Sequence, residues 1–127
     1  MCFISCFQAD TLDVTESNLL GQWEAVSVKG RMITNSGDEI FIDDKIKHTK
    51  IVIFNKSNIG FLETDDDLNE FTWIVDGNRI NFYSKHNTNV YTVVHWLKER
   101  EMELFHMEED GTGTRKEIHV RYRKVIE

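Results

Sequence analysis

The sequence of 127 residues contains no proline, and its two cysteines, Cys2 and Cys6, lie within the first six residues. A disulfide or a thiolate metal site within the body of the fold is therefore excluded. Only seven glycines are present, which together with the lack of proline excludes a collagen-like repeat or a proline-rich linker. No apolar run approaches the roughly 20 residues that a membrane-spanning helix needs. The length suits one domain.

Basic residues are also few, since 15 Lys and Arg stand against 22 Asp and Glu for a formal net charge of −7. This balance argues against nucleic acid or an anionic membrane surface as the main partner, because both attract clustered positive charge. Hydrophobic residues make up 40% of the chain and aromatic residues 11%, which is too much for a disordered chain. The composition predicts one acidic, soluble, globular domain.

The first nine residues, Met1 to Ala9, are apolar and rich in small side chains, and Asp10 ends this run. Such a segment is typical of the end of an export signal. The stretch Phe3-Ile4-Ser5-Cys6 resembles the box in which a bacterial lipoprotein is cleaved before a cysteine that is then acylated. We therefore expect a bacterial protein that is periplasmic, outer-membrane-associated or secreted, with Cys6 as the lipid attachment site. A plain N-terminal tail with two incidental thiols is the alternative that these residues leave open.

After an N-terminal segment over residues 1–14, residues 15–127 predict a single domain that is almost entirely β. A short helical turn is expected over Thr15 to Leu20, because Thr15 is a good N-cap residue and Glu16 places an acid in the first turn. From Gly21 onward, alternating polarity, β-branched and aromatic side chains and Asn/Asp/Gly turns predict strands. Eight main strands are expected over residues 22–28, 47–55, 59–64, 70–76, 79–84, 89–97, 101–107 and 114–125.

These strands follow one another through short turns, with one longer polar connection over residues 29–45, within which Ile40 to Ile42 can form a short extra strand. An antiparallel meander of this length removes its open edges by closing on itself, and about eight strands enclose room for side chains or one small ligand. A sandwich is the rival fold, but it needs longer connections between its sheets. The sequence predicts an all-β fold, an eight-stranded antiparallel meander β-barrel with a short N-terminal helical turn.

The tripeptide Gly21-Gln22-Trp23 stands at the entry to the first strand, after the helical turn. Its Gly-x-Trp pattern resembles the signature of the lipocalin (calycin) superfamily, and the closing strand with Val120-Arg121-Tyr122 resembles that of small bacterial lipocalin-like domains. The resemblance implies that Gly21 allows a tight turn, that Trp23 closes one end of the barrel, and that Arg121 packs over its ring. The chain departs from the family in lacking its structural disulfide and C-terminal helix.

A lipocalin-like barrel implies a small hydrophobic molecule as the ligand and no cofactor. The apolar side of each predicted strand selects the candidate lining, although the alternation around Tyr91 is ambiguous: Phe61, Trp73, Phe82, Tyr91, Leu104 and Tyr122. The same side chains also suit plain core packing, so an open and a filled interior both remain. We expect a non-enzymatic binding module, which touches a membrane only through an anchor at Cys6 and whose oligomeric state stays open.

Residues capable of catalysis or metal binding form no recognisable motif. The five histidines show no HxH or HExxH spacing, and no G-x-S-x-G is present. Because His95, His106 and His119 fall on three successive predicted strands, two of them can be neighbours, but we expect a surface ladder and no metal. The alternative function is a protein-interaction barrel of the protease-inhibitor type, which acts through residues 10–16 and 29–45. An enzyme on a calycin barrel is a third alternative.

Overall fold

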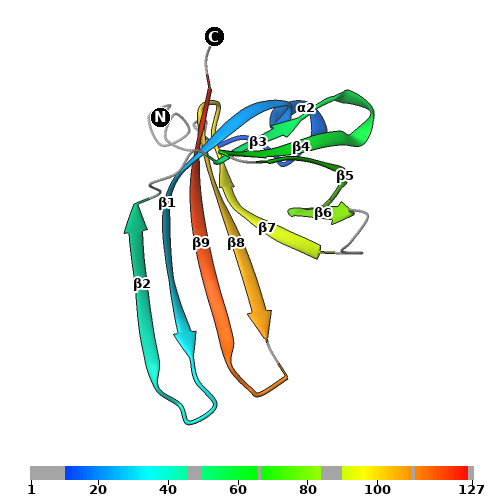
Figure 1. The fold of residues 1–127 in the computed structure, drawn as a ribbon. Helices are drawn as coiled ribbons and strands as arrows, with labels where there is room; N and C mark the ends of the chain where they lie inside the picture. Colours follow the sequence, from blue (N-terminus) through cyan, green and yellow to red (C-terminus); the bar gives the residue numbers. More distant parts are fainter. Residues whose placement is uncertain (1–10, 46–49, 66, 84–89, 110, 126–127) are drawn as a thin grey trace, which may run out of the picture.

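The computed structural model describes residues 11–45, 50–65, 67–83, 90–109 and 111–125, and its sheet closes into a barrel (Figure 1). The strand order is β2-β1-β3-β4-β5-β6-β7-β8-β9, and β9 pairs back onto β1. Every pairing is antiparallel. The predicted eight-stranded barrel is confirmed: it consists of β1 and β3 to β9, and β2 is an additional strand. The strands are β1 (Gly21–Ile33), β2 (Glu39–Lys45), β3 (Lys50–Phe54), β4 (Ile59–Thr64), β5 (Leu68–Asp76), β6 (Arg79–Tyr83), β7 (Val90–Leu97), β8 (Glu101–Glu109) and β9 (Arg115–Lys124).

The predicted helical turn is also present, as α2 (Glu16–Leu19). Its N-cap is Thr15, whose hydroxyl oxygen accepts a hydrogen bond from the Asn18 amide at 3.2 Å. Just before this turn, the Leu12 amide donates to the Leu97 carbonyl at 2.7 Å, and Leu12 and Val14 pack against the core. No helix among the described residues is long and apolar enough to cross a membrane.

Residues 29–45 form a long β-hairpin, so the prediction of a polar connection is wrong, whereas the short extra strand expected at Ile40 to Ile42 is present as part of β2. β1 continues to Ile33, and the Thr34 amide donates to the Asp38 carbonyl at 2.9 Å to close a turn that leads into β2. The first residues of β1 pair with β3, and its second half pairs with β2 on that same edge. The strands β2, β1, β9 and β8 therefore extend together beyond the other strands (Figure 1). We call this four-stranded extension, from Ser27 to the tip, the arm.

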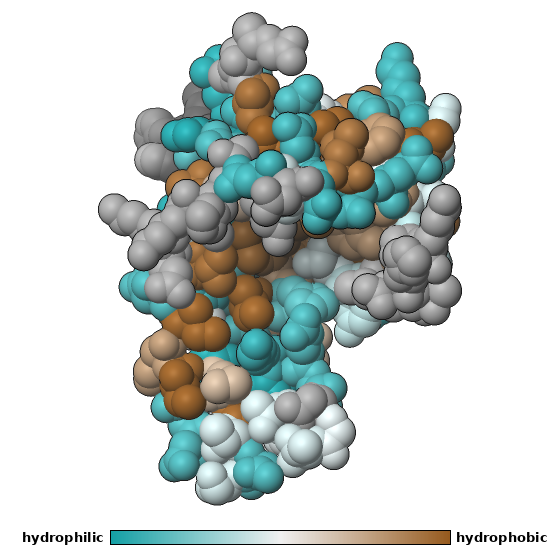
Figure 2. All heavy atoms as spheres, viewed as in Figure 1, coloured by the Kyte–Doolittle hydropathy of each residue, from teal (hydrophilic) through white to brown (hydrophobic). Residues whose placement is uncertain are grey.

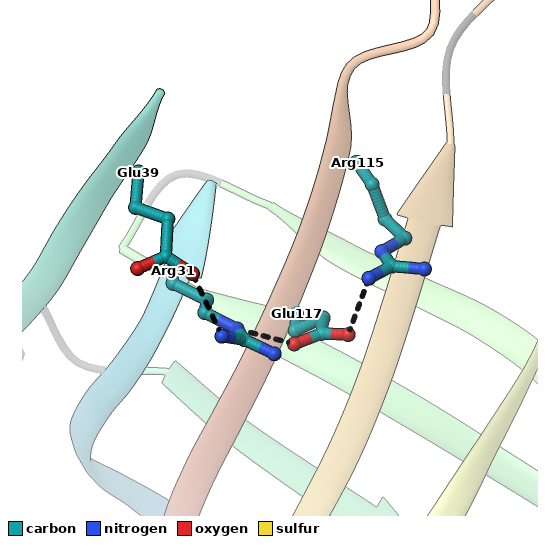
Figure 3. Close-up of polar contacts among 4 residues, drawn as sticks. All are labelled: Arg31, Glu39, Arg115 and Glu117. Atoms are coloured by element: carbon teal, nitrogen blue, oxygen red, sulfur yellow. Dashed lines mark hydrogen bonds and ion pairs between the residues drawn. The ribbon is translucent and has the colours of Figure 1, made fainter. Parts of the chain in front are cut away.

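Ion pairs hold the strands of the arm together on its outer face (Figure 3). Arg31 of β1 contacts Glu39 of β2 (Nη1 to Oε1, 2.9 Å) and Glu117 of β9 (Nε to Oε1, 2.7 Å). Arg115 approaches the other oxygen of Glu117 at 3.5 Å. The hydrogen bond from Arg31 lowers the pKa of Glu117, and the same contact raises the pKa of Arg31. Each surface pair is weak alone, but the network favours one register for three strands.

Aromatic side chains fill the barrel between β3, β5 and β6. The rings of Phe54 and Trp73 lie 4.8 Å apart, and those of Phe71 and Phe82 lie 5.2 Å apart, both edge to face. Gly60 makes room for Phe71, because a Cβ at Gly60 would lie 2.5 Å from that ring. The buried apolar core comprises Leu19, Trp23, Ala25, Val52, Phe54, Trp73, Ile80, Val94, Leu97, Met102, Leu104 and Tyr122.

Candidate functional site

Trp23 closes the end of the barrel that lies next to α2. Its side chain is fully buried, and its Nε1 donates a hydrogen bond to the Leu19 carbonyl at 2.9 Å. Gly21, two residues earlier, has a φ of +123°, and a Cβ there would lie 2.9 Å from Cε of Lys124. Glycine is therefore needed at position 21 for the backbone conformation, whereas the end of the flexible Lys124 side chain can shift away from an added Cβ.

The cation over Trp23 is Lys124, so the prediction that Arg121 fills this place is wrong. Lys124 is the direct cross-strand partner of Trp23, and its Nζ lies 5.2 Å from the centre of the indole ring. Arg121 is three residues earlier on β9, and because side chains alternate along a strand it points to the outer face. Its guanidinium lies 5.6 Å over the ring of Trp96 instead.

Four of the six predicted lining residues point into the barrel. Trp73, Leu104 and Tyr122 are buried in the core, and Phe82 packs against it. Burial raises the pKa of the Tyr122 hydroxyl to about 12. Because these side chains contact one another and the rest of the core, they fill the interior at the closed end and do not line a deep cup.

Phe61 and Tyr91 lie on the outer face, so their assignment to the lining is wrong. Phe61 pairs with Ile53 and Glu70, while Gly60 holds the inward position beside it, which the ring of Phe71 occupies. Tyr91 is 45% exposed, and the guanidinium of Arg79 lies 5.0 Å from its ring centre. In β3 and β4 both faces carry apolar side chains, so hydrophobicity alone cannot distinguish inside from outside.

The inner face of the arm continues the apolar interior beyond the rim of the barrel. Residues that are direct cross-strand partners point to the same face of the sheet. Beyond Tyr122, the first row on the inner face contains Val28, Val120 and Leu104. The next row contains Ile42 on β2 and Ile118 on β9, with Gly30 of β1 between them. A third row places Ile40 and Met32 beside Lys116 near the tip.

Exposure increases along these rows. Leu104 and Tyr122 are buried, Val28, Ile42, Ile118 and Val120 are half-buried, and Ile40 is 49% exposed. Figure 2 shows hydrophobic residues that follow the arm and reach the hollowed centre of this face. We call this surface the inner shelf; it consists of Val28, Met32, Ile40, Ile42, Ile118 and Val120. It is the largest departure from the sequence prediction, which assigned the end of β1 to a polar connection and expected only a short strand at Ile40 to Ile42 where β2 runs from Glu39 to Lys45.

A separate depression of about 430 Å³ lies beside α2 and the short 3-10 turn at Lys56–Asn58. Polar and apolar groups both line it, and Asn58 Nδ2 donates hydrogen bonds to the Trp73 carbonyl at 2.9 Å and to the Glu16 carboxylate. These bonds join α2 to the barrel, so the depression is best explained by how the two parts of the chain pack. Cys6, the predicted lipid attachment site, lies outside the described residues.

Comparisons with known proteins establish no family for this chain. No family model matches it, and no curated protein sequence matches it. Among solved structures, it is similar to a protein of unknown function from the DUF3598 family of Nostoc punctiforme, with a TM-score of 0.47 and 11% sequence identity. That alignment covers 89% of this chain and 50% of the other, so the chain spans half the length of its structural neighbour. The description of the fold therefore depends on the chain's own strand pairing.

Proposed function

We propose that this protein is a non-enzymatic binding module that holds an apolar or amphipathic molecule against the inner shelf, at the mouth of the barrel. One observation carries the proposal: the apolar interior does not end at the rim but continues along one wall into solvent. Buried Leu104 leads to half-buried Val120 and Ile118, and then to Ile40, which is 49% exposed. Exposed apolar surface that is continuous with a pocket or interior is a common mark of a ligand site.

The dimensions and polarity of the inner shelf favour a molecule with a long alkyl chain. The distance from Tyr122 to Lys116 along β9 is about 20 Å for extended backbone. Lys116 is the cross-strand partner of Met32 on β1 and of Glu108 on β8, so a lysine and a glutamate stand side by side at the exposed end of the apolar track. An alkyl chain along Val120 and Ile118 with a polar head beside this charged pair fits this order.

The affinity expected for a generic ligand is modest, because the inner shelf forms one wall and not an enclosed cup. Contact over ~250 Å² of apolar surface yields a gross gain near ~6 kcal/mol at about 25 cal/mol per Å². Loss of translational and rotational freedom offsets at least roughly 4 kcal/mol of this. We therefore expect micromolar or weaker binding for an ordinary fatty acid, and tighter binding only where polar groups contribute.

Strand β2 offers a matched test of this proposal, because its apolar residues alternate between the two faces. Ile40 and Ile42 belong to the inner shelf, whereas Phe41 between them is on the outer face and 74% exposed. The variant Ile40→Ser/Ile42→Ser should weaken binding of a fluorescent long-chain fatty acid at least several-fold. Phe41→Ser, the control on the same strand, should leave the affinity unchanged. Equal affinity of the inner-face variant and the wild-type chain would contradict the proposal.

A specific observation favours protein interaction as the second candidate function. β2 is the end strand of the sheet order, so one of its edges lacks a strand partner among the described residues, and Phe41 is exposed next to this edge. Open strand edges accept an added strand from another chain. In that case Phe41→Ser would weaken association with a partner, and the fatty-acid affinity would be the same in both β2 variants.

The proposed setting is the periplasm, the outer membrane or the outside of a bacterial cell. The support is the apolar segment Met1 to Ala9 together with the position of Cys6. Metabolic labelling with a palmitate analogue tests the anchor: labelling that Cys6→Ser abolishes and Cys2→Ser retains would support acylation at Cys6. Absence of label from the wild-type chain would contradict it.

A further inference from the structure

Two histidines and a glutamate from three neighbouring strands meet on the outer face of the barrel. His95 is on β7, Glu103 on β8 and His119 on β9, and one ring nitrogen from each histidine and one carboxylate oxygen all lie within 4.8 Å of one another. The Glu103 Oε2 atom is shared, since it lies 2.5 Å from His95 Nδ1 and 3.4 Å from His119 Nδ1. The rings of the two histidines are 5.6 Å apart.

A β-bulge places His95 and Trp96 together opposite Glu103. The register between β7 and β8 shifts between Val94 and Trp96, so that His95 is the extra residue opposite Glu103. Val94 and Leu97 on either side are buried in the core, while His95 is exposed. In an uninterrupted strand, position 95 and position 97 would share one face. The bulge therefore keeps Trp96 on the outer face beside His95 and returns Leu97 to the core, and such bulges are frequent beside functional sites.

The site is held in place on its buried side. The Glu103 side chain is only 17% exposed, and the ring of Phe105 lies 4.7 Å from that of His119. The Nδ1 atom of His119 is itself buried and has no hydrogen-bond partner among the described residues. Its polar neighbour is Glu103 Oε2, which approaches to 3.4 Å without a hydrogen bond. A buried nitrogen that makes no hydrogen bond is costly, and an ion is one of the ordinary explanations for it.

We propose that His95, Glu103 and His119 form a binding site for a divalent transition-metal ion, with zinc as the ion that this donor set favours. Imidazole nitrogen and carboxylate oxygen are common zinc ligands, and two ligand atoms on one tetrahedral zinc ion lie about 3.3 Å apart. The 3.4 Å contact between Glu103 and His119 is already close to that spacing, whereas the 2.5 Å contact between Glu103 and His95 has to lengthen to admit the ion. Small rotations of the His95, Glu103 and His119 side chains would bring their three ligand atoms around one ion. The solvent-exposed side of the ion would keep at least one coordination position for water or another ligand.

The charges around the site explain why the carboxylate is needed. Arg121 is the cross-strand partner of Glu103, and Lys29 is that of His119 on β1. Both cations would oppose an incoming metal ion, and the single negative charge of Glu103 offsets part of this repulsion. Because Arg121 lies over Trp96, its charge is held on the β7 side of the site. We therefore expect all three ligands to be required for binding.

The experiment is a calorimetric Zn²⁺ titration of the full-length chain in a Cys2→Ser/Cys6→Ser background, which removes competing thiolates. One Zn²⁺ ion should bind per chain. His95→Gln and His119→Gln should each lower the affinity at least tenfold, and Glu103→Gln should also weaken it. His106→Gln is the matched control, since His106 also contacts a glutamate, Glu108, at 3.1 Å but on the opposite face of β8.

Imidazole ¹⁵N spectra provide a second readout that a merely structural role would not change. Addition of Zn²⁺ should shift one ring nitrogen of His95 and one of His119 while the signals of His106 stay in place. The proposal is wrong if the chain shows no saturable Zn²⁺ binding. It is also wrong if the folded His95→Gln and His119→Gln variants bind with the affinity of the parent.

Discussion

Replacing Trp23 with phenylalanine tests whether this side chain closes the barrel as the structure places it. The indole is fully buried, and its Nε1 donates to the Leu19 carbonyl at 2.9 Å. Phenylalanine leaves that carbonyl without its partner, at a cost of about 1–3 kcal/mol. The volume that it vacates adds about 1 kcal/mol. We expect the free energy of unfolding to fall by about 2–4 kcal/mol.

The assay is urea unfolding followed by circular dichroism, because loss of an indole would distort a fluorescence signal. Trp96→Phe is the matched control, since Trp96 is half-buried on the outer face and should lose less than about 1 kcal/mol. Lys124→Met, which removes the cation over Trp23, should cost about 0.5–1 kcal/mol. If Trp23→Phe cost no more than Trp96→Phe, the assignment of Trp23 as the closing side chain would be refuted.

Three further predictions concern the core and the arm. Because burial raises the pKa of Tyr122 to about 12, its ionisation in the unfolded chain should lower the free energy of unfolding by up to about 3 kcal/mol from pH 10 to pH 12; alkaline unfolding of Tyr122→Phe should lack this loss. Gly60→Ala should cost about 1–3 kcal/mol in urea unfolding, because the new Cβ would lie 2.5 Å from the Phe71 ring. Gly111→Ala, which has no atom within 4 Å, should change stability by less than about 0.5 kcal/mol. Since Arg31 lowers the pKa of Glu117, the contribution of this pair is present at neutral pH and lost as pH falls below about 4; Tm measured from pH 6 to pH 3 should fall less steeply for Glu117→Gln.

The barrel itself was predictable from the sequence, because it depends on local signals. Alternating polarity along β5 and β9 and the turn at Asp76-Gly77-Asn78 each identify a strand or a hairpin without reference to the rest of the chain. Thr15 likewise identifies the start of α2, whose N-cap bond the structure contains. Signals of this kind are sufficient for strand number and order when the connections are short.

The arm was not predictable in the same way, because its strands depend on partners far along the sequence. Lys29, Gly30 and Arg31 resemble a loop when taken alone, yet each has a partner on both β2 and β9. Gly30 suits this strand because β9 approaches closely there: a Cβ would lie 2.1 Å from the Glu117 carbonyl oxygen.

The errors in the candidate site come from the register of the strands. The regular alternation of inward and outward side chains is interrupted by a bulge in β1, between Ala25 and Ser27, and by another in β7, between Val94 and Trp96. The second bulge explains why Val94 and Leu97, three residues apart, both point inward while Tyr91 points outward. The relative position of His95, Glu103 and His119 likewise depends on this bulge and on the pairing of three strands, which one sequence does not specify.

Binding at the inner shelf is the central claim, and methyl NMR of the full-length chain tests it most directly. Addition of a long-chain fatty acid should shift the methyl signals of Ile42, Ile118 and Val120, in a saturable manner and with one common dissociation constant. The methyl signals of Ile59 and Ile74 serve as internal controls, because these side chains are 41% and 45% exposed on the outer face. Shifts confined to the inner shelf are the predicted result. Shifts at Ile59 and Ile74 of equal size, or no shift at saturating ligand, would contradict the account.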